Sequence, residues 1–177
     1  MKFLIGIILI TLTMNSQTIV DLTTSSDLQN WRIVDDVVMG GRSSGNFELT
    51  AAGHGRYTGE ISLKNNGGFS SLRYTFPRMN VSPDNHIRLR IKGDGKKYQF
   101  RVKNNRRIRH SYVYEFASSG KWETVNIPLQ EMYPVFRGRN LELPDFDHNS
   151  IEELIILIGN KKPESFELLI DKIELLE

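Results

Sequence analysis

The sequence predicts an all-β fold, a sandwich of two packed antiparallel sheets. Apolar and polar residues alternate with a period of two along most of the chain, and Gly, Asn, Asp and Pro gather between the alternating runs. Apolar residues at helical spacing are nearly absent. Because the runs are short and numerous, two packed sheets accommodate them better than a single layer does.

The alternating runs define the expected strands. These strands cover 18–22, 32–38, 46–51, 56–63, 69–76, 86–92, 97–103, 107–117, 122–127, 153–158 and 165–175. The run 153–158, ELIILI, does not alternate and is therefore expected to be a central strand that is covered on both faces. Only 25–31 and 146–152 have the composition of a helical turn.

The middle of the chain allows strand faces and neighbours to be assigned. Apolar residues alternate with basic ones through 86–92 and again through 97–103, on either side of the turn Gly93-Asp94-Gly95. A turn of this composition between two alternating runs predicts a hairpin. A second turn at Asn104-Asn105 leads into 107–117, whose even-numbered aromatic residues we expect to face the core.

Residues 1–16 have the features of a secretory signal peptide. One lysine precedes an apolar run, FLIGIILITL, that is too short to cross a bilayer comfortably. Cleavage after Ser16 would leave 17–177 as a single domain of about 160 residues, large enough to bury its own core. We expect a secreted or periplasmic protein with no membrane span after signal removal, and an uncleaved anchor is the less favoured alternative. The chain has no cysteine, so disulfides do not hold it.

Charge is nearly balanced overall but unevenly distributed. The chain has 23 Lys and Arg against 21 Asp and Glu, a formal net charge of +2 that does not indicate nucleic-acid binding. Ten of the 23 basic residues lie between Arg88 and Arg109, against one acid, Asp94. The predicted strands would gather a basic face from Arg88, Arg90, Arg101, Lys103, Arg107 and Arg109. Such a face is either an ordinary solvated surface or a grid of N–H donors that binds an acidic partner or polyanion.

The most distinctive segment is Trp31–Gly45, WRIVDDVVMGGRSSG, which is followed a little later by Asn65–Phe69, NNGGF. Consecutive strand residues point to opposite faces, so Asp35 and Asp36 cannot form a close acid/base pair unless the strand breaks there. The glycines that follow permit a break. We expect a turn in which one carboxylate accepts hydrogen bonds from backbone N–H groups or pairs with Arg42. Contact with a ligand or partner is the second interpretation, and catalysis is the least favoured.

Other chemistry finds little support. GGRSSG lacks the Lys-Ser/Thr ending of a phosphate loop, and NNGG is most simply a turn, although exposed amides beside Phe69 and Arg73 could bind sugar hydroxyls. The four histidines lie in unrelated settings, so we assign no catalytic residue, no metal and no cofactor. Calcium between Asp21 and Asp171 is a minor alternative, if the first and last strands pair.

Together these segments resemble the complex I intermediate-associated protein 30 family. The matching pieces are Trp31 with VDDVVMGGRSSG at 34–45, YTGEISL at 57–63, NNGGFSSLR at 65–73, KGDGKKY at 92–98, Trp122 with VNIPL at 125–129, and FRG at 136–138. The resemblance implies a galactose-binding-like jelly roll akin to some carbohydrate-binding modules. The matched motif positions, which are candidates for contacting a ligand or partner, are Asp36, Met39, Gly40, Gly41, Ser43, Asn66, Gly67, Gly68, Phe69 and Arg73.

The resemblance implies a binding domain that is not an enzyme. Mitochondrial members of the family are assembly chaperones for the respiratory NADH dehydrogenase and act by protein contact. An exported chain would not reach that compartment, so we carry over only the general role: an exported, protein-binding domain that resembles an assembly factor. The alternative is a carbohydrate-binding module. A hydrolase that uses Asp35 and Asp36 is the third hypothesis.

Overall fold

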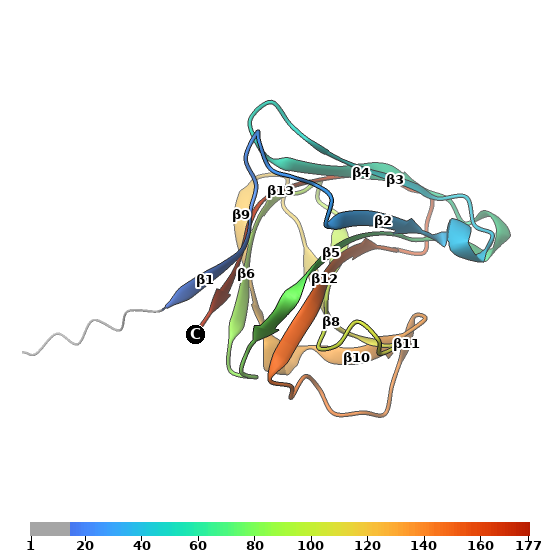
Figure 1. Ribbon diagram of the computed structural model, residues 1–177. Helices are drawn as coiled ribbons and strands as arrows, with labels where there is room; N and C mark the ends of the chain where they lie inside the picture. Colours follow the sequence, from blue (N-terminus) through green and yellow to red (C-terminus); the bar gives the residue numbers. More distant parts are fainter. Residues whose placement is uncertain (1–14) are drawn as a thin grey trace, which may run out of the picture.

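The computed structural model describes residues 15–177 and shows two antiparallel sheets packed face to face (Figure 1). The predicted β-sandwich is therefore confirmed. The apolar run of the expected signal peptide lies outside the described residues, and so does nearly all of 1–16.

One sheet has six strands. They are β1 (Ser16–Asp21), β3 (Ser44–Leu49), β4 (Gly55–Ile61), β6 (His86–Lys92), β9 (Trp122–Pro128) and β13 (Glu164–Leu176). The order is β3-β4-β13-β6-β9. β13 is long enough to pair with β4 along its first half and with β1 along its second half, while β6 occupies its other edge. β1 therefore brings the two ends of the described chain side by side (Figure 1).

The other sheet has seven strands. They are β2 (Trp31–Asp35), β5 (Ser70–Asn80), β7 (Lys97–Lys103), β8 (Ser111–Ala117), β10 (Tyr133–Phe136), β11 (Arg139–Asn140) and β12 (Ser150–Ile158). The order is β11-β10-β8-β7-β12-β5-β2. β12 is central, as ELIILI predicts, and both Leu154 and Ile155 are buried although they point to opposite faces.

The core fills the space between the sheets. Ile87, Leu89 and Ile91 of β6 are fully buried there, as the alternation predicts. Phe100 of β7 faces them from the other sheet and is also fully buried. Burial of one such side chain stabilises the fold by roughly 1.5–3 kcal/mol. Strands that alternate in this way therefore have one energetically preferred face, which fixes which residues remain outside.

The expected hairpin between β6 and β7 is wrong. β6 pairs with β13 and β9, whereas β7 pairs with β12 and β8 in the opposite sheet. The turn between them crosses the sandwich. There the carboxylate of Asp94 accepts hydrogen bonds from the Glu167 N–H of β13 at 2.9 Å and from the Tyr98 hydroxyl of β7 at 3.0 Å. Alternation identifies the inward face of each strand, but it does not identify the strand's neighbour. The second expected turn does join paired strands, β7 and β8.

Several boundaries also differ from expectation. The helical turns expected at 25–31 and 146–152 are absent from the described chain; its helical segments are the 3₁₀ turns η1 (Asp36–Met39), η2 (Lys64–Asn66) and η3 (Leu129–Glu131). β2 ends at Asp35 because η1 begins at Asp36, and β8 begins at Ser111 rather than at 107. The short strands β10 and β11 were not expected. Within residues 15–177, no helix has the length and apolar character that crossing a membrane requires.

Candidate functional sites: a carboxylate corner and an arginine face

A buried carboxylate organises one end of the sandwich. Asp36 follows β2 and is 0% exposed. Its Oδ1 accepts the Ser43 N–H at 2.9 Å, and its Oδ2 accepts the N–H groups of Gly68 at 2.5 Å and Phe69 at 3.3 Å, as well as the Ser43 hydroxyl. Burial disfavours the charged form, but these hydrogen bonds outweigh it and hold the pKa of Asp36 below its ordinary value. The carboxylate thus ties η1 to the loop before β5.

Two glycines of the motif are explained by this carboxylate. A Cβ atom at Gly41 or at Gly67 would collide with the Asp36 side chain. Gly40 has a φ of 90°, in the left-handed region that glycine adopts without strain. Its carbonyl accepts the side-chain amide of Asn65 at 3.1 Å, which joins η1 to η2. We call the segments 36–43 and 63–69 together the carboxylate corner.

The neighbouring carboxylate has a different set of partners. Asp35 accepts the Gly45 N–H at 2.9 Å and the Ser70 hydroxyl at 2.5 Å, and Ser70 in turn accepts the Tyr57 hydroxyl at 2.8 Å. Asp35 and Ser70 belong to the seven-stranded sheet, whereas Gly45 and Tyr57 belong to the six-stranded sheet. This carboxylate therefore links the two sheets. No ion pair between Arg42 and either aspartate occurs among the described residues.

The outside of the carboxylate corner is apolar. Val37, Val38, Met39 and Leu63 are 59%, 72%, 59% and 41% exposed. They are four of the six large apolar side chains that are exposed in the part of the chain the structure describes. Leu63 lies in the other segment of the corner, with its side chain close to Gly68. Figure 1 shows η1 and η2 side by side at the end of the sandwich away from β1.

The structure places the motif positions in three settings. The first is the buried carboxylate of Asp36, which is surrounded by Gly41, Ser43, Gly67, Gly68 and Phe69. Met39, Gly40 and Asn66 lie on the surface of the same corner. Arg73 lies elsewhere, on β5, and its side chain joins a second group of polar residues.

The expected single basic face is wrong, because β6 and β7 lie in different sheets. On the six-stranded sheet, Arg88 pairs with Glu174 at 2.9 Å and Arg90 pairs with Asp171 at 3.2 Å. Arg101 and Lys103 lie on the seven-stranded sheet, and Arg107 and Arg109 lie in the loop between β7 and β8. The six basic residues are therefore divided among two outer faces and a loop.

A different cationic group forms on the outer face of the seven-stranded sheet. Arg73 on β5 and Arg101 on β7 flank Ile155 of β12 in register, and Arg32 lies directly opposite Arg73. Lys103 lies directly opposite Glu153. We call Arg32, Arg73, Arg101 and Lys103, together with Glu153, the arginine face.

The carboxylate of Glu153 is shared among three of these cations. Its side chain is 2% exposed and lies 3.1 Å from Arg32, 3.6 Å from Arg73 and 4.0 Å from Lys103. Burial lowers the pKa of both Arg73 and Lys103 from their ordinary values, and Glu153 only partly opposes that effect. One carboxylate therefore does not offset the cost of burying several cations.

Arg101 has only neutral hydrogen-bond partners. Its guanidinium donates to Gln99 Oε1 and, at 3.3 Å, to the Ser111 hydroxyl. Among residues 15–177, no carboxylate lies within ion-pair distance of it. Burial, together with the nearby charge of Arg73, lowers the pKa of Arg101 to about 10. The face thus contains a half-buried positive charge with no carboxylate of the described residues within ion-pair distance.

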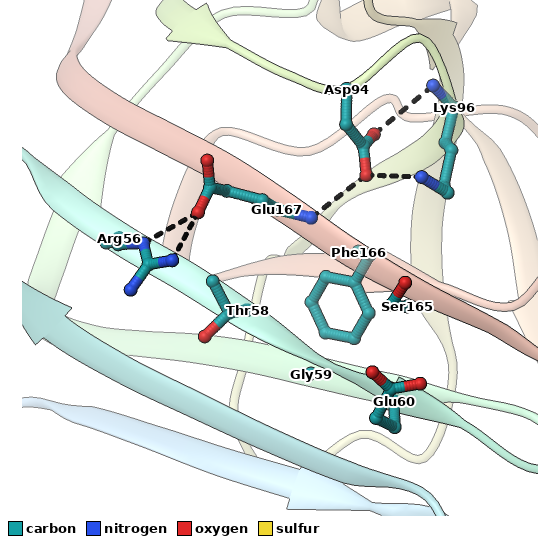
Figure 2. A pocket seen from close by; sticks show the side chains of 9 residues that line it. All are labelled: Arg56, Thr58, Gly59, Glu60, Asp94, Lys96, Ser165, Phe166 and Glu167. Atoms are coloured by element: carbon teal, nitrogen blue, oxygen red, sulfur yellow. Dashed lines mark hydrogen bonds and ion pairs between the residues drawn. The ribbon is translucent and has the colours of Figure 1, made fainter.

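Two surface pockets lie away from both groups. Figure 2 shows the first, of about 420 Å³, between β4, β13 and the 93–96 turn. Its charged groups bind one another: Asp94 pairs with Lys96 at 2.7 Å, and Arg56 pairs with Glu167 at 2.6 Å. The second, of about 550 Å³, is lined by Arg78, Asn105, Arg106, Arg107 and Glu152. Glu152 pairs there with Arg78 at 2.9 Å.

The calcium alternative can be compared directly with the structure. β1 and β13 do pair, but Asp21 faces Lys172 at 3.7 Å, whereas Asp171 faces His54 at 3.0 Å and Arg90 at 3.2 Å. The two carboxylates therefore have separate cationic neighbours. Within the described range, no cluster of three or more potential protein ligands is arranged to hold a metal ion.

The sequence reasoning overlooked Arg32 and Glu153. Each was assigned to a strand, but the arginine face needs the register of four strands, which alternation does not supply. The exposure of Val37 and Val38 was also overlooked, because both were interpreted as the end of the strand 32–38. The glycines at 40 and 41 did indicate a break in the chain, but not its start at Asp36.

Solved structures with this fold define its class. A family 11 carbohydrate-binding module of a Clostridium thermocellum cellulosomal cellulase is 17% identical with a TM-score of 0.67, covering 92% of this chain and 95% of that chain. The same kind of module in complex with a β-1,3-1,4-mixed-linked tetrasaccharide has a TM-score of 0.64 at 17% identity, over 90% and 94%. A mutant family 29 module is 9% identical with a TM-score of 0.56, over 93% of each chain. The chain thus has the β-sandwich fold of these carbohydrate-binding modules.

The family follows from the sequence comparisons. The family described as complex I intermediate-associated protein 30 matches residues 20–170, and this chain belongs to it. An uncharacterized protein of Schizosaccharomyces pombe is 30% identical over 168 residues, which cover 82% of this chain and 77% of that protein.

Proposed function

We propose that this chain is a non-enzymatic binding domain that contacts a protein partner through the apolar surface of its carboxylate corner. The observation that carries this proposal is the concentration of apolar exposure there. Val38 is 72% exposed, yet it lies on a turn whose neighbour, Asp36, is fully buried and hydrogen-bonded. Large apolar residues gathered on a soluble surface typically mark an interaction site.

The corner is suited to binding because it is already ordered. Four hydrogen bonds to one carboxylate fix η1 against the loop before β5. A rigid element loses less conformational entropy on association than a flexible one does. Met39 at the tip can adapt to an irregular surface because its side chain is unbranched. The partner we propose is therefore a protein with an apolar groove.

The same geometry argues against the hydrolase hypothesis. Asp35 and Asp36 direct their oxygens at different N–H and hydroxyl donors of the scaffold. A general base needs an oxygen within reach of a substrate proton or an attacking water. Here the carboxylates support the turn, and the apolar residues face outward.

Affinity capture tests this proposal. The bait is the domain with Val38 and Met39 both changed to Ser, beside wild type and a Leu143→Ser control, which removes an exposed leucine elsewhere. We expect wild type and the control to recover one partner from extracts of the source cells and the double variant to lose it at least tenfold. Equal recovery by all three baits would contradict the proposal, and so would a wild-type bait that recovers no such partner.

A second candidate function is carbohydrate binding. It is favoured by the fold, since the similar solved structures are carbohydrate-binding modules and one is a complex with a mixed-linked tetrasaccharide. Titration with that neutral tetrasaccharide and with a panel of other neutral oligosaccharides tests it. Absence of heat and of amide chemical-shift changes throughout the panel would count against a neutral ligand.

We also propose that residues 1–16 direct export. The support is the apolar run after one lysine in the sequence. Fractionation of cells that express the full chain, with N-terminal sequencing of the product, tests this. A cytoplasmic product that begins at Met1 would contradict it.

A further inference from the structure

The arginine face carries more positive charge than its surroundings neutralise. It has four cations, and Glu153 is the carboxylate within ion-pair distance of Arg32, Arg73 and Lys103. The other acid on this face, Glu115, is exposed and binds the amide of Gln99 at 2.8 Å. A buried cation without a counter-charge is costly, so a face built in this way favours an added anion.

Two guanidinium groups have donor capacity to spare. The Nε–H of Arg73 is inaccessible to solvent and has no hydrogen-bond partner among the described residues. Arg101 donates to the neutral oxygens of Gln99 and Ser111. Guanidinium groups bind carboxylates through paired N–H donors, and such charge-assisted hydrogen bonds are roughly twice as strong as neutral ones. A carboxylate between these arginines would give both guanidinium groups a negatively charged hydrogen-bond acceptor.

The register places the two arginines at a useful distance. Arg73 and Arg101 each lie opposite Ile155, on the two strands beside β12. Strands are spaced about 4.8 Å apart, so their Cα atoms lie on the order of 10 Å from each other. Two long side chains can close over a group of carboxylate size in that interval. Ile155 lies between the two arginines and is 3% exposed, so neighbouring side chains already cover it.

The same row continues to an aromatic residue. Arg101 lies opposite Val113, and Val113 lies opposite Tyr133 of β10. Tyr133 is half-buried, so part of its ring is accessible. A carboxylate site with an aromatic ring two strands away suits a sugar acid, whose ring packs on an aromatic side chain while its carboxylate is bound nearby.

We propose that the arginine face binds an acidic oligosaccharide of the uronate class, with Arg73 and Arg101 gripping one carboxylate and Tyr133 contacting a neighbouring sugar ring. This inference rests on the second candidate function, carbohydrate binding. It is independent of the carboxylate corner, which uses other residues at the end of the sandwich.

Calorimetric titration of the mature domain with tetragalacturonate tests the proposal. The key variant is Arg101→Gln, and its control is Arg90→Gln, which removes the same charge from the opposite sheet. We expect wild type and the control to bind within twofold of each other and Arg101→Gln to bind at least tenfold more weakly. Neutral cellotetraose should bind wild type at least tenfold more weakly than tetragalacturonate does.

A measurement on wild type alone guards against a variant that fails to fold. In a ¹⁵N spectrum of arginine side chains, the Nε–H resonances of Arg73 and Arg101 should shift on saturation with tetragalacturonate, while that of Arg90 should not. If cellotetraose binds as tightly as tetragalacturonate, this inference fails while carbohydrate binding stands. If neither saccharide binds, this inference fails, and the panel of neutral oligosaccharides decides whether carbohydrate binding stands. Equal or tighter binding of tetraglutamate would overturn the assignment to a saccharide.

Discussion

Asp36 and Glu153, the two most buried carboxylates of the described residues, have opposite surroundings in the same fold. Asp36 is surrounded by neutral donors, three backbone N–H groups and one hydroxyl. Glu153 is surrounded by cations, at 3.1 Å to 4.0 Å. The first arrangement saturates the carboxylate and fixes a turn. The second leaves the positive charge of the cations in excess over the single carboxylate. A carboxylate whose oxygens are fully hydrogen-bonded to neutral donors thus supports the fold, whereas one that is shared among several cations leaves positive charge available for a ligand.

The largest effect is expected from Asp36→Ala. It would leave three backbone N–H groups without an acceptor in a buried place, so we expect a loss of about 3 kcal/mol in the free energy of unfolding. Urea denaturation measures it. Asp145→Ala, at an exposed position, is the control and should change stability by no more than about 0.5 kcal/mol. Similar stabilities for the two variants would show that the corner does not depend on the carboxylate.

Glu153→Gln should cost less, about 2 kcal/mol, because the cations it leaves unpaired are partly solvated. This variant should also respond to added anions differently from Asp36→Ala. Added sulfate should restore more stability to this variant than it adds to wild type, because an anion can replace the lost charge. Asp36→Ala should gain no such excess. Urea denaturation with and without sulfate decides the point, and identical gains in both variants would remove the distinction.

The next largest effect is expected in the pH dependence of stability, through the hydrogen-bonded carboxylate of Asp36. The pKa of Asp36 is lowered in the folded state, so its stabilisation is present above the ordinary aspartate value of about 3.9 and is lost as the pH falls through the folded value. Wild type should therefore lose thermal stability between pH 5 and pH 2 more steeply than Asp36→Asn does. Melting temperatures across this range measure it. Parallel curves would contradict the assignment.

The smallest effect on stability is expected at the apolar tip. Val38→Ser changes an exposed side chain that packs on little, so the free energy of unfolding should stay within about 0.5 kcal/mol of wild type. A loss of partner capture on substitution of Val38 could then not be attributed to a loss of stability. A larger loss, measured by urea denaturation, would mean that the apolar tip is part of the folded core.

Local pattern was sufficient to predict much of the fold. Alternation through 86–92 and 97–103 identified Ile87 and Phe100 as core residues, and both are buried. ELIILI was recognisable as a central strand because both of its faces are apolar. Local pattern did not predict which strands pair with each other. The Gly93-Asp94-Gly95 turn has hairpin composition, yet Asp94 makes its hydrogen bonds across the sandwich.

The candidate sites divide along the same line. The turn at Asp36 was predictable because the residues that need it, Gly40 and Gly41, are close in sequence. The arginine face was not, because Arg32, Arg101 and Glu153 come together only through the order β7-β12-β5-β2. Sequence spacing describes a turn well, but it describes a sheet surface poorly when its neighbours, such as Arg32 and Arg73 or Arg101 and Ile155, are distant in the sequence.

The pairing of β1 with the second half of β13 has a consequence for assembly. β1 occupies the edge that Lys172 to Leu176 would otherwise leave open. A shortened chain that began after Asp21 would present that stretch as an unpaired strand edge, which is a template for another chain. Such a chain is expected to self-associate by edge pairing, far from either candidate site, and its loss of solubility would then report on β1 alone.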